Sequence, residues 1–174
     1  MTTMKFKTTI EKFAHNPTWG HHFPVPTEYA EPFLQGEDRR ILLKINDNPE
    51  IHCALMPGGD NTWFITATAE LRKKLSLSLG EEVTLHIRKD ESKYGIALPA
   101  EMKEILETDD EGSRVFHGLT PGKQRSLLYI TGKPKTSNTR IKKALMVIDY
   151  LKSVNGNLDF KELNEFFKLR KNDY

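Results

Sequence analysis

A passage of thirteen residues occurs twice in this chain, and this repeat constrains the fold more than any other feature of the sequence. Trp63 to Leu75 reads WFITATAELRKKL, and Tyr94 to Leu106 reads YGIALPAEMKEIL. Four of the thirteen positions are identical and three more are similar in kind. Each copy has the pattern of a short apolar strand, a small turn and a short helix. We therefore expect a β-barrel with internal pseudo-twofold symmetry, completed within one chain.

The residues before 110 have the patterns of a β-rich domain. Alternating apolar and polar residues predict strands at 4–13, 39–46, 50–56, 62–67, 82–89 and, in the second copy, 94–98. Short helices are expected at 27–34, 70–75 and 100–106. The segment from His15 to Pro26 contains three prolines, which exclude a long helix there.

The pattern becomes helical after residue 110. Helices are expected at 114–119, 120–131 and 138–154, with a last one after Asp159. Thr120 and Pro121 are typical of a helix start, and Asp159 with Glu162 forms a capping box. The long helix has an apolar stripe of Ile141, Ala144, Leu145, Ile148 and Leu151. We therefore predict an α+β chain with a β-barrel domain at 1–110 and a helical module at 111–174.

Two short runs in and after the first copy match a known pattern. They are Glu70-Leu71-Arg72-Lys73-Lys74-Leu75 and Leu79-Gly80-Glu81-Glu82-Val83. In both, the chain resembles the swapped-hairpin element of the AbrB/MazE/MraZ superfamily, in which two chains usually pair to complete one double-split barrel. The resemblance implies an AbrB-like double-split β-barrel. The repeat adds the expectation that the barrel needs no dimer partner, so that a monomer is favoured.

A second resemblance extends over residues 5–155. The matching residues are Phe23-Pro24-Val25-Pro26, Arg39-Arg40-Ile41, Leu55-Met56-Pro57-Gly58-Gly59-Asp60, Leu98-Pro99, Phe116-His117-Gly118-Leu119-Thr120, Tyr129-Ile130, Lys133, Lys135 and Thr139-Arg140-Ile141. In these the chain resembles a bacterial family of unknown function that joins such a barrel domain to a helical module named for YdeI and OmpD-associated proteins. It departs from the family at Thr131-Gly132 and Pro134. The family label implies a role in bacteriocin protection or envelope stress and gives no mechanism.

Charge is distributed unevenly along the chain. Residues 1–112 hold 13 Lys and Arg against 19 Asp and Glu, whereas residues 113–174 hold 13 against 5. Such asymmetry indicates either a basic surface for an anionic partner or two segments that attract each other.

The basic residues of the second half suggest a binding site at the start of the long helix. The loop from Gly132 to Asn138 combines lysines, hydroxyl groups and free backbone N–H groups, which suit a phosphate or another anion. Tyr129 is near enough in sequence to stack on a base. We predict that Lys133, Lys135, Arg140 and Lys143 contact an anionic ligand or nucleic acid. The alternative is a solvated helix face without a function.

The candidates for catalysis or metal binding have simpler explanations. His15, His21, His22 and His52 do not have the spacing of metal ligands, and the lone Cys53 reads as a buried thiol. The acidic run 109–111 fits a linker or a helix start. We therefore expect a non-enzymatic interaction protein with no cofactor and no metal.

Two other functions stay open. One is an AbrB-like DNA-binding transcriptional regulator, which the excess of acidic residues in the barrel domain opposes. The other is an unrecognised enzyme that uses the histidines at 15–22 or a cleft between the modules. With no apolar run of membrane-spanning length, the chain is expected to be cytoplasmic.

Overall fold

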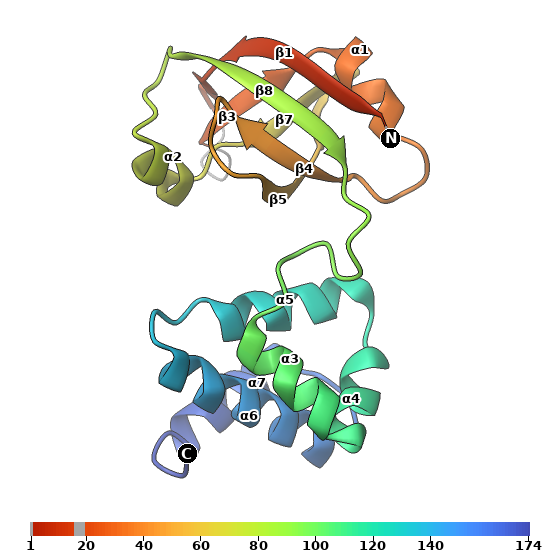
Figure 1. Ribbon diagram of the computed structural model, residues 1–174, viewed down its shortest axis with the longest axis vertical. Coiled ribbons are helices and arrows are strands. Elements are labelled where there is room, and N and C mark those ends of the chain that lie inside the picture. Colours follow the sequence, from red (N-terminus) through yellow and green to blue (C-terminus); the bar gives the residue numbers. More distant parts are fainter. Residues whose placement is uncertain (1, 16–19) are drawn as a thin grey trace. The chain divides into compact units, whose positions relative to one another are not determined.

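The structure is a computed structural model that describes residues 2–15 and 20–174. It divides into two compact units, Met1–Gly95 and Ile96–Tyr174, which are coloured red to green and green to blue in Figure 1. Part of the proline-rich segment expected at 15–26 lies outside the described residues. Over the described ranges we find no helix with the length and apolar character needed to span a membrane.

The first unit, the β unit, consists in its described part of two four-stranded antiparallel sheets and three short helical segments. The first sheet has the order β1-β8-β4-β5 and the second has the order β2-β3-β7-β6. The strands are β1 (Thr3–Thr9), β2 (Glu11–Lys12), β3 (His21–Val25), β4 (Arg40–Ile45), β5 (Ile51–Ala54), β6 (Met56–Gly59), β7 (Thr62–Thr66) and β8 (Glu82–Lys89). The helical segments are α1 (Thr27–Ala30), the 3-10 helix η1 (Glu31–Phe33) and α2 (Ala69–Leu75).

The two sheets are joined at both edges by continuous chain. Strand β1 continues into β2 through Ile10, and β5 continues into β6 through Leu55. Both residues are 1% exposed, so each change of sheet is fixed by a buried aliphatic side chain. The core between the sheets follows the alternation of the strands: Ile41, Leu43 and Ile45 of β4 point inward, as do Leu85 and Ile87 of β8. No ladder pairs a strand of one sheet with the other in the described ranges, so the predicted closed barrel is not observed.

The second copy of the sequence repeat does not form the strand predicted at 94–98. All strands of the described β unit end before Asp90, and residues 91–99 form turns and irregular chain. The turn is fixed by Asp90, whose carboxylate accepts hydrogen bonds from the backbone N–H and the hydroxyl of Ser92. Gly95 then adopts a φ of +67°, which favours glycine and breaks an extended strand. The helical half of the copy does form, and the internal repeat therefore does not build a symmetric barrel.

The second unit, the helical unit, consists of five helices. They are α3 (Ala100–Thr108), α4 (Asp110–His117), α5 (Pro121–Gly132), α6 (Ser137–Ser153) and α7 (Phe160–Leu169). Side-chain oxygens of Asp109, Thr120, Thr136 and Asp159 cap four of them. The starts predicted at Thr120 and Asp159 are confirmed.

The division between the units lies earlier than the predicted boundary at 110/111. Helix α3 packs against α4 and α6, so it belongs to the helical unit. The sequence repeat led to the prediction that residues 100–106, which belong to α3, lie in the β-rich domain, because residues 94–106 are similar to residues 63–75. Helix α2, the counterpart of α3 in the first copy, lies in the β unit, so the same short sequence pattern supports a helix in two different surroundings.

The apolar stripe predicted for α6 is confirmed in part. Ala144, Ile148 and Leu151 are buried, but Ile141 is 42% exposed and Leu145 is 37% exposed. Met146, Val147 and Tyr150 are buried instead, because α6 is contacted by α3, α4, α5 and α7. A central helix surrounded in this way buries more than one stripe of its surface.

Candidate anion-binding interface

The four predicted contact residues lie around the connection between α5 and α6. Lys133 directly follows α5, Lys135 lies in the loop, and Arg140 and Lys143 lie in the first two turns of α6. Lys133 and Lys135 are exposed, whereas Arg140 and Lys143 are half-buried. The structure therefore separates the four residues into two pairs with different surroundings.

Arg140 is bound within the helical unit. Its Nε and Nη2 atoms donate to Oε1 of Glu101 in α3 at 3.0 and 2.8 Å. Its Nη1 atom donates to the backbone carbonyls of Pro134 and Lys135 at 3.1 and 3.0 Å. The guanidinium group thus ties α3, the α5–α6 loop and α6 together.

Glu101 occupies the position at the start of α6 that was predicted for an external anion. Its Oε1 atom also accepts a hydrogen bond from the hydroxyl of Ser137, the first residue of α6, at 2.7 Å. The hydrogen bonds from Arg140 and Ser137 lower the pKa of the Glu101 carboxyl to about 2. Sequence analysis missed this role because Glu101 lies 36 residues before Ser137, and no local pattern connects the two positions.

Replacing Arg140 with methionine is expected to raise the pKa of Glu101 toward its ordinary value of 4.5, because the largest cause of the lowered pKa is lost. A carboxyl group whose pKa is lowered by folding stabilises the fold above its unfolded pKa. That contribution disappears as the pH falls through the folded pKa. The wild-type helical unit should therefore lose this contribution between about pH 4.5 and pH 2.

Carbon-detected NMR titration of the Glu101 carboxyl measures the change in both proteins. The control variant is Lys168→Met, which removes the exposed ion pair with Glu165 and should leave the Glu101 titration as it is in the wild type. An unchanged Glu101 titration in Arg140→Met would contradict the assigned ion pair.

Lys143 and Lys133 both lie over aromatic rings. The Nζ atom of Lys143 is 3.6 Å from the centre of the Phe167 ring in α7, and burial lowers the pKa of Lys143. The Nζ atom of Lys133 is 5.6 Å from the ring centre of Tyr129, which is 53% exposed. Lys143 is thus packed within the unit, whereas Lys133, Tyr129 and Lys135 remain open to a partner.

The two observed units differ less in charge than the segments 1–112 and 113–174 do. The β unit holds 12 Lys and Arg against 13 Asp and Glu, and the helical unit holds 14 against 11. Acidic residues of 101–111 pair with bases of the helical unit itself, as in Glu101 with Arg140 and Asp109 with Lys152. Much of the apparent asymmetry therefore comes from the predicted boundary, and the excess of positive charge in the helical unit is modest.

His52 belongs to a polar cluster that the sequence did not reveal. Its Nδ1 atom lies 2.7 Å from Oδ2 of Asp90, whose side chain is fully buried. The Ser92 hydroxyl donates to the other carboxylate oxygen at 2.6 Å. The serine is therefore bound to the carboxylate and not to the imidazole, which differs from the order required to activate a serine nucleophile. The cluster fixes the turn that ends the β unit.

His22 and Cys53, two further candidates for catalysis or metal binding, are packed within the β unit. The His22 ring stacks on Phe13 with 3.8 Å between ring centres, and burial lowers its pKa. Burial also raises the pKa of the Cys53 thiol to about 12, so the reactive thiolate is disfavoured. Within residues 2–15 and 20–174, no group of three or more His, Cys, Asp or Glu side chains is placed to hold a metal ion.

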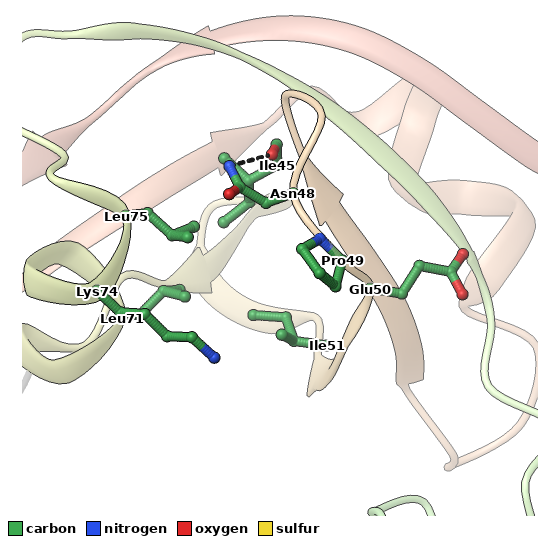
Figure 2. Close-up of a pocket in the computed structure, with 8 residues that line it drawn as sticks. All are labelled: Ile45, Asn48, Pro49, Glu50, Ile51, Leu71, Lys74 and Leu75. Atoms are coloured by element: carbon green, nitrogen blue, oxygen red, sulfur yellow. Dashed lines mark hydrogen bonds between the residues drawn. The ribbon is translucent and has the colours of Figure 1, made fainter.

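A small apolar pocket lies in the β unit between α2 and the turn from β4 to β5. Figure 2 shows Leu71 and Leu75 of α2 facing Ile45 and Ile51 across this pocket. Its volume is about 90 Å³, and Lys74, Glu50, Asn48 and Pro49 complete its lining. The walls are mainly aliphatic, and Glu50 at the edge is bound to Arg88, so the pocket provides chiefly packing surface.

These observations define an α+β protein in which a β unit of two joined sheets precedes a five-helix unit. Comparison with protein families gives the same division. Residues 6–87 match the family described as a domain of unknown function, DUF1905. Residues 96–153 match the family described as bacteriocin-protection, YdeI or OmpD-associated, OmdA. The chain therefore carries a DUF1905 domain followed by an OmdA domain. Searches of curated proteins and of solved structures found no match.

Proposed function

We propose that this protein is a non-enzymatic interaction protein whose helical unit binds an anionic partner through Lys133 and Lys135. The observation that carries the proposal is the double attachment of Arg140, which binds Glu101 and also the carbonyl groups of Pro134 and Lys135. These bonds hold the loop that carries both lysines in one conformation. A loop that is ordered before binding loses less conformational entropy when a partner binds.

The surroundings of the two lysines favour a phosphate-bearing partner. Thr136 and Thr139 lie exposed in the same segment with their hydroxyl oxygens 2.8 Å apart, so one of the two hydroxyl hydrogens remains for a partner. Tyr129 lies beside Lys133. Lysine ammonium groups provide charge, hydroxyl groups donate hydrogen bonds, and an exposed aromatic ring can stack on a base. Arg140 and Lys143 act as positioning residues in this proposal, since each is already bound inside the unit.

Fluorescence anisotropy with labelled duplex DNA and single-stranded RNA, at low and near-physiological salt, tests the proposal. The double variant Lys133→Ala/Lys135→Ala should lower the affinity at low salt by about tenfold or more. It should also make the salt dependence shallower by about 1.5 in the slope of log K against log salt. The control variant Lys161→Ala/Lys171→Ala removes two exposed charges elsewhere in the same unit and should have a small effect. Equal losses in both variants, or no binding at low salt, would contradict the proposal.

The OmdA family description supports a proposal about the cellular role, namely that the chain contributes to bacteriocin protection. The same double variant connects this role to the interface. Expression of the wild-type chain in a bacteriocin-sensitive bacterium should increase survival, and the Lys133→Ala/Lys135→Ala variant should not. Equal survival with both proteins would show that the cellular role does not depend on the two lysines of this loop.

A second candidate function is DNA binding by the β unit, in the manner of AbrB-like regulators. The observation that favours it is the order of β7, α2 and β8, because the residues that resemble the swapped-hairpin element form a strand, a short helix and a strand. A regulator of this kind would be a dimer on duplex DNA. Light scattering that gives a dimer, together with preference for duplex over single strands, would favour this function over the first.

A further inference from the structure

The outer face of the first sheet carries a row of basic side chains. Phe6, Leu85 and Ile45 point into the core, so their neighbours on each strand point outward. Lys5 of β1 and Lys44 of β4 lie directly opposite His86 of the middle strand β8. In Figure 1 no helix of the β unit covers β1, β8 and β4 on this side. The row Lys5–His86–Lys44 is therefore an accessible feature of the sheet.

This row brings two lysines close to one histidine on the same face of the sheet. Side chains directly opposite each other on neighbouring strands lie about 5 Å apart at Cβ. Two acidic groups near the row are engaged with other bases, whereas Asp47 lines a hollow together with Lys5 and His86. Glu82 accepts from Lys7 at 2.8 Å, and Glu50 accepts from Arg88 at 2.6 and 2.7 Å. Glu82 and Glu50 are thus paired with Lys7 and Arg88 and not with the lysines of the row.

The row lies beside a polar hollow with a volume of about 340 Å³. Lys5, Thr84 and His86 line it, together with Asn46 and Asp47 of the turn after β4. The Asn46 side-chain oxygen accepts from the backbone N–H of Thr84 at 2.9 Å, and the Asn46 backbone N–H donates to the Thr84 carbonyl at 2.8 Å. The amide oxygen is therefore used within the protein, which leaves the NH₂ group of Asn46 as its donor toward the hollow.

We propose that this hollow binds the phosphate group of an anionic ligand beside Lys5 and His86, with Lys44, which is the neighbour of His86 on β4 and does not line the hollow, as a second cation next to it. Two strand spacings separate the lysine backbones by about 10 Å, so two long side chains approach one anion from opposite sides. The hydroxyl of Thr84 and the amide of Asn46 supply neutral donors to the same anion. Asp47 opposes binding, because its carboxylate lines the hollow as well. This site is independent of the interface proposed on the helical unit.

NMR titration of the full chain with inorganic phosphate, at constant ionic strength adjusted with chloride, tests the site. We expect saturable shifts at Lys5, Thr84 and His86 and at the side-chain amide of Asn46. The variant Lys5→Ala/Lys44→Ala should abolish saturation. The variant Asp47→Asn should tighten binding by about three- to tenfold, as expected for removal of one nearby like charge. The control variant Lys12→Ala/Lys73→Ala, which removes exposed charges outside the row, should bind as the wild type does.

A second titration with an eight-residue deoxythymidine oligonucleotide distinguishes the sources of phosphate. Affinity per phosphate equal to that of the free ion indicates a small ligand, whereas tighter and salt-dependent binding indicates a nucleic-acid backbone. Non-saturating shifts with inorganic phosphate, or saturation that survives in Lys5→Ala/Lys44→Ala, would overturn the proposal. Because Lys133→Ala/Lys135→Ala leaves this hollow intact, loss of the helical interface does not affect the outcome.

Discussion

Replacing Phe116 with alanine is expected to destabilise the helical unit by about 3–5 kcal/mol, the usual cost of truncating a buried aromatic side chain. Phe116 lies in α4, is 0% exposed, and is among the largest fully buried side chains of the protein. Its removal leaves a cavity that rigid neighbouring helices fill only in part. Urea unfolding followed by circular dichroism at the helix band measures the loss, because the helical unit contributes most of the α-helix in the described chain.

Phe160→Ala is the matched control for this substitution. Phe160 is the first residue of α7 and is 37% exposed, so its truncation removes less buried surface. We expect a loss of about 1 kcal/mol or less at this position. A similar loss in both variants would contradict the assignment of Phe116 to the centre of the core.

Replacing Gly112 with alanine is expected to destabilise the same unit, although alanine is the better helix former. Alanine is favoured over glycine by about 1 kcal/mol inside a helix. At Gly112, however, an added Cβ would lie 2.5 Å from Cγ2 of Ile148 in α6 and 3.0 Å from the carboxyl carbon of Asp109. Overpacking of this kind costs about 1–3 kcal/mol. The steric cost therefore exceeds the gain in helix propensity, and we expect a net loss of about 1–2 kcal/mol.

The variant Gly122→Ala is expected to give the opposite result in the same unfolding experiment, namely a gain in stability. An added Cβ at Gly122, in the first turn of α5, meets no atom within 4 Å, so this variant should gain about 0.4–1 kcal/mol. Adding Ile148→Ala to Gly112→Ala should give a loss smaller than the sum of the two single losses, because it removes the methyl group that the new Cβ would meet. If Gly112→Ala raised stability as Gly122→Ala does, the close contact between α4 and α6 would be refuted.

The elements that the sequence predicted well are those with strong local signals. Strand β8 and helix α2 have clear periodicity, and the starts of α5 and α7 have capping residues at Thr120 and Asp159. The strand predicted at 94–98 failed because a short apolar run was read without its surroundings. A buried carboxylate, Asp90, and a glycine with positive φ, Gly95, determine the conformation there.

Only part of the candidate site could be predicted from the sequence, and the reason is similar. The sequence places Lys133 and Lys135 beside a helix start, and the structure leaves both exposed. The roles of Arg140 and Lys143 depend on Glu101 and Phe167, which lie on other helices and are distant in sequence. Contacts of this kind have no periodic signal. The basic row of the sheet was hidden for the same reason, since Lys5, Lys44 and His86 come together only through strand pairing.

The most direct test of the proposed function is an NMR titration of the full chain with a single-stranded RNA oligonucleotide, observed through backbone amides. We expect saturable shifts concentrated at residues 129–139, where Tyr129, Lys133 and Lys135 lie. The affinity obtained from these shifts should fall steeply as the salt concentration rises, and the shifts should disappear in Lys133→Ala/Lys135→Ala. Saturable shifts that leave residues 129–139 unchanged, or the absence of any saturable shift at low salt, would contradict the account.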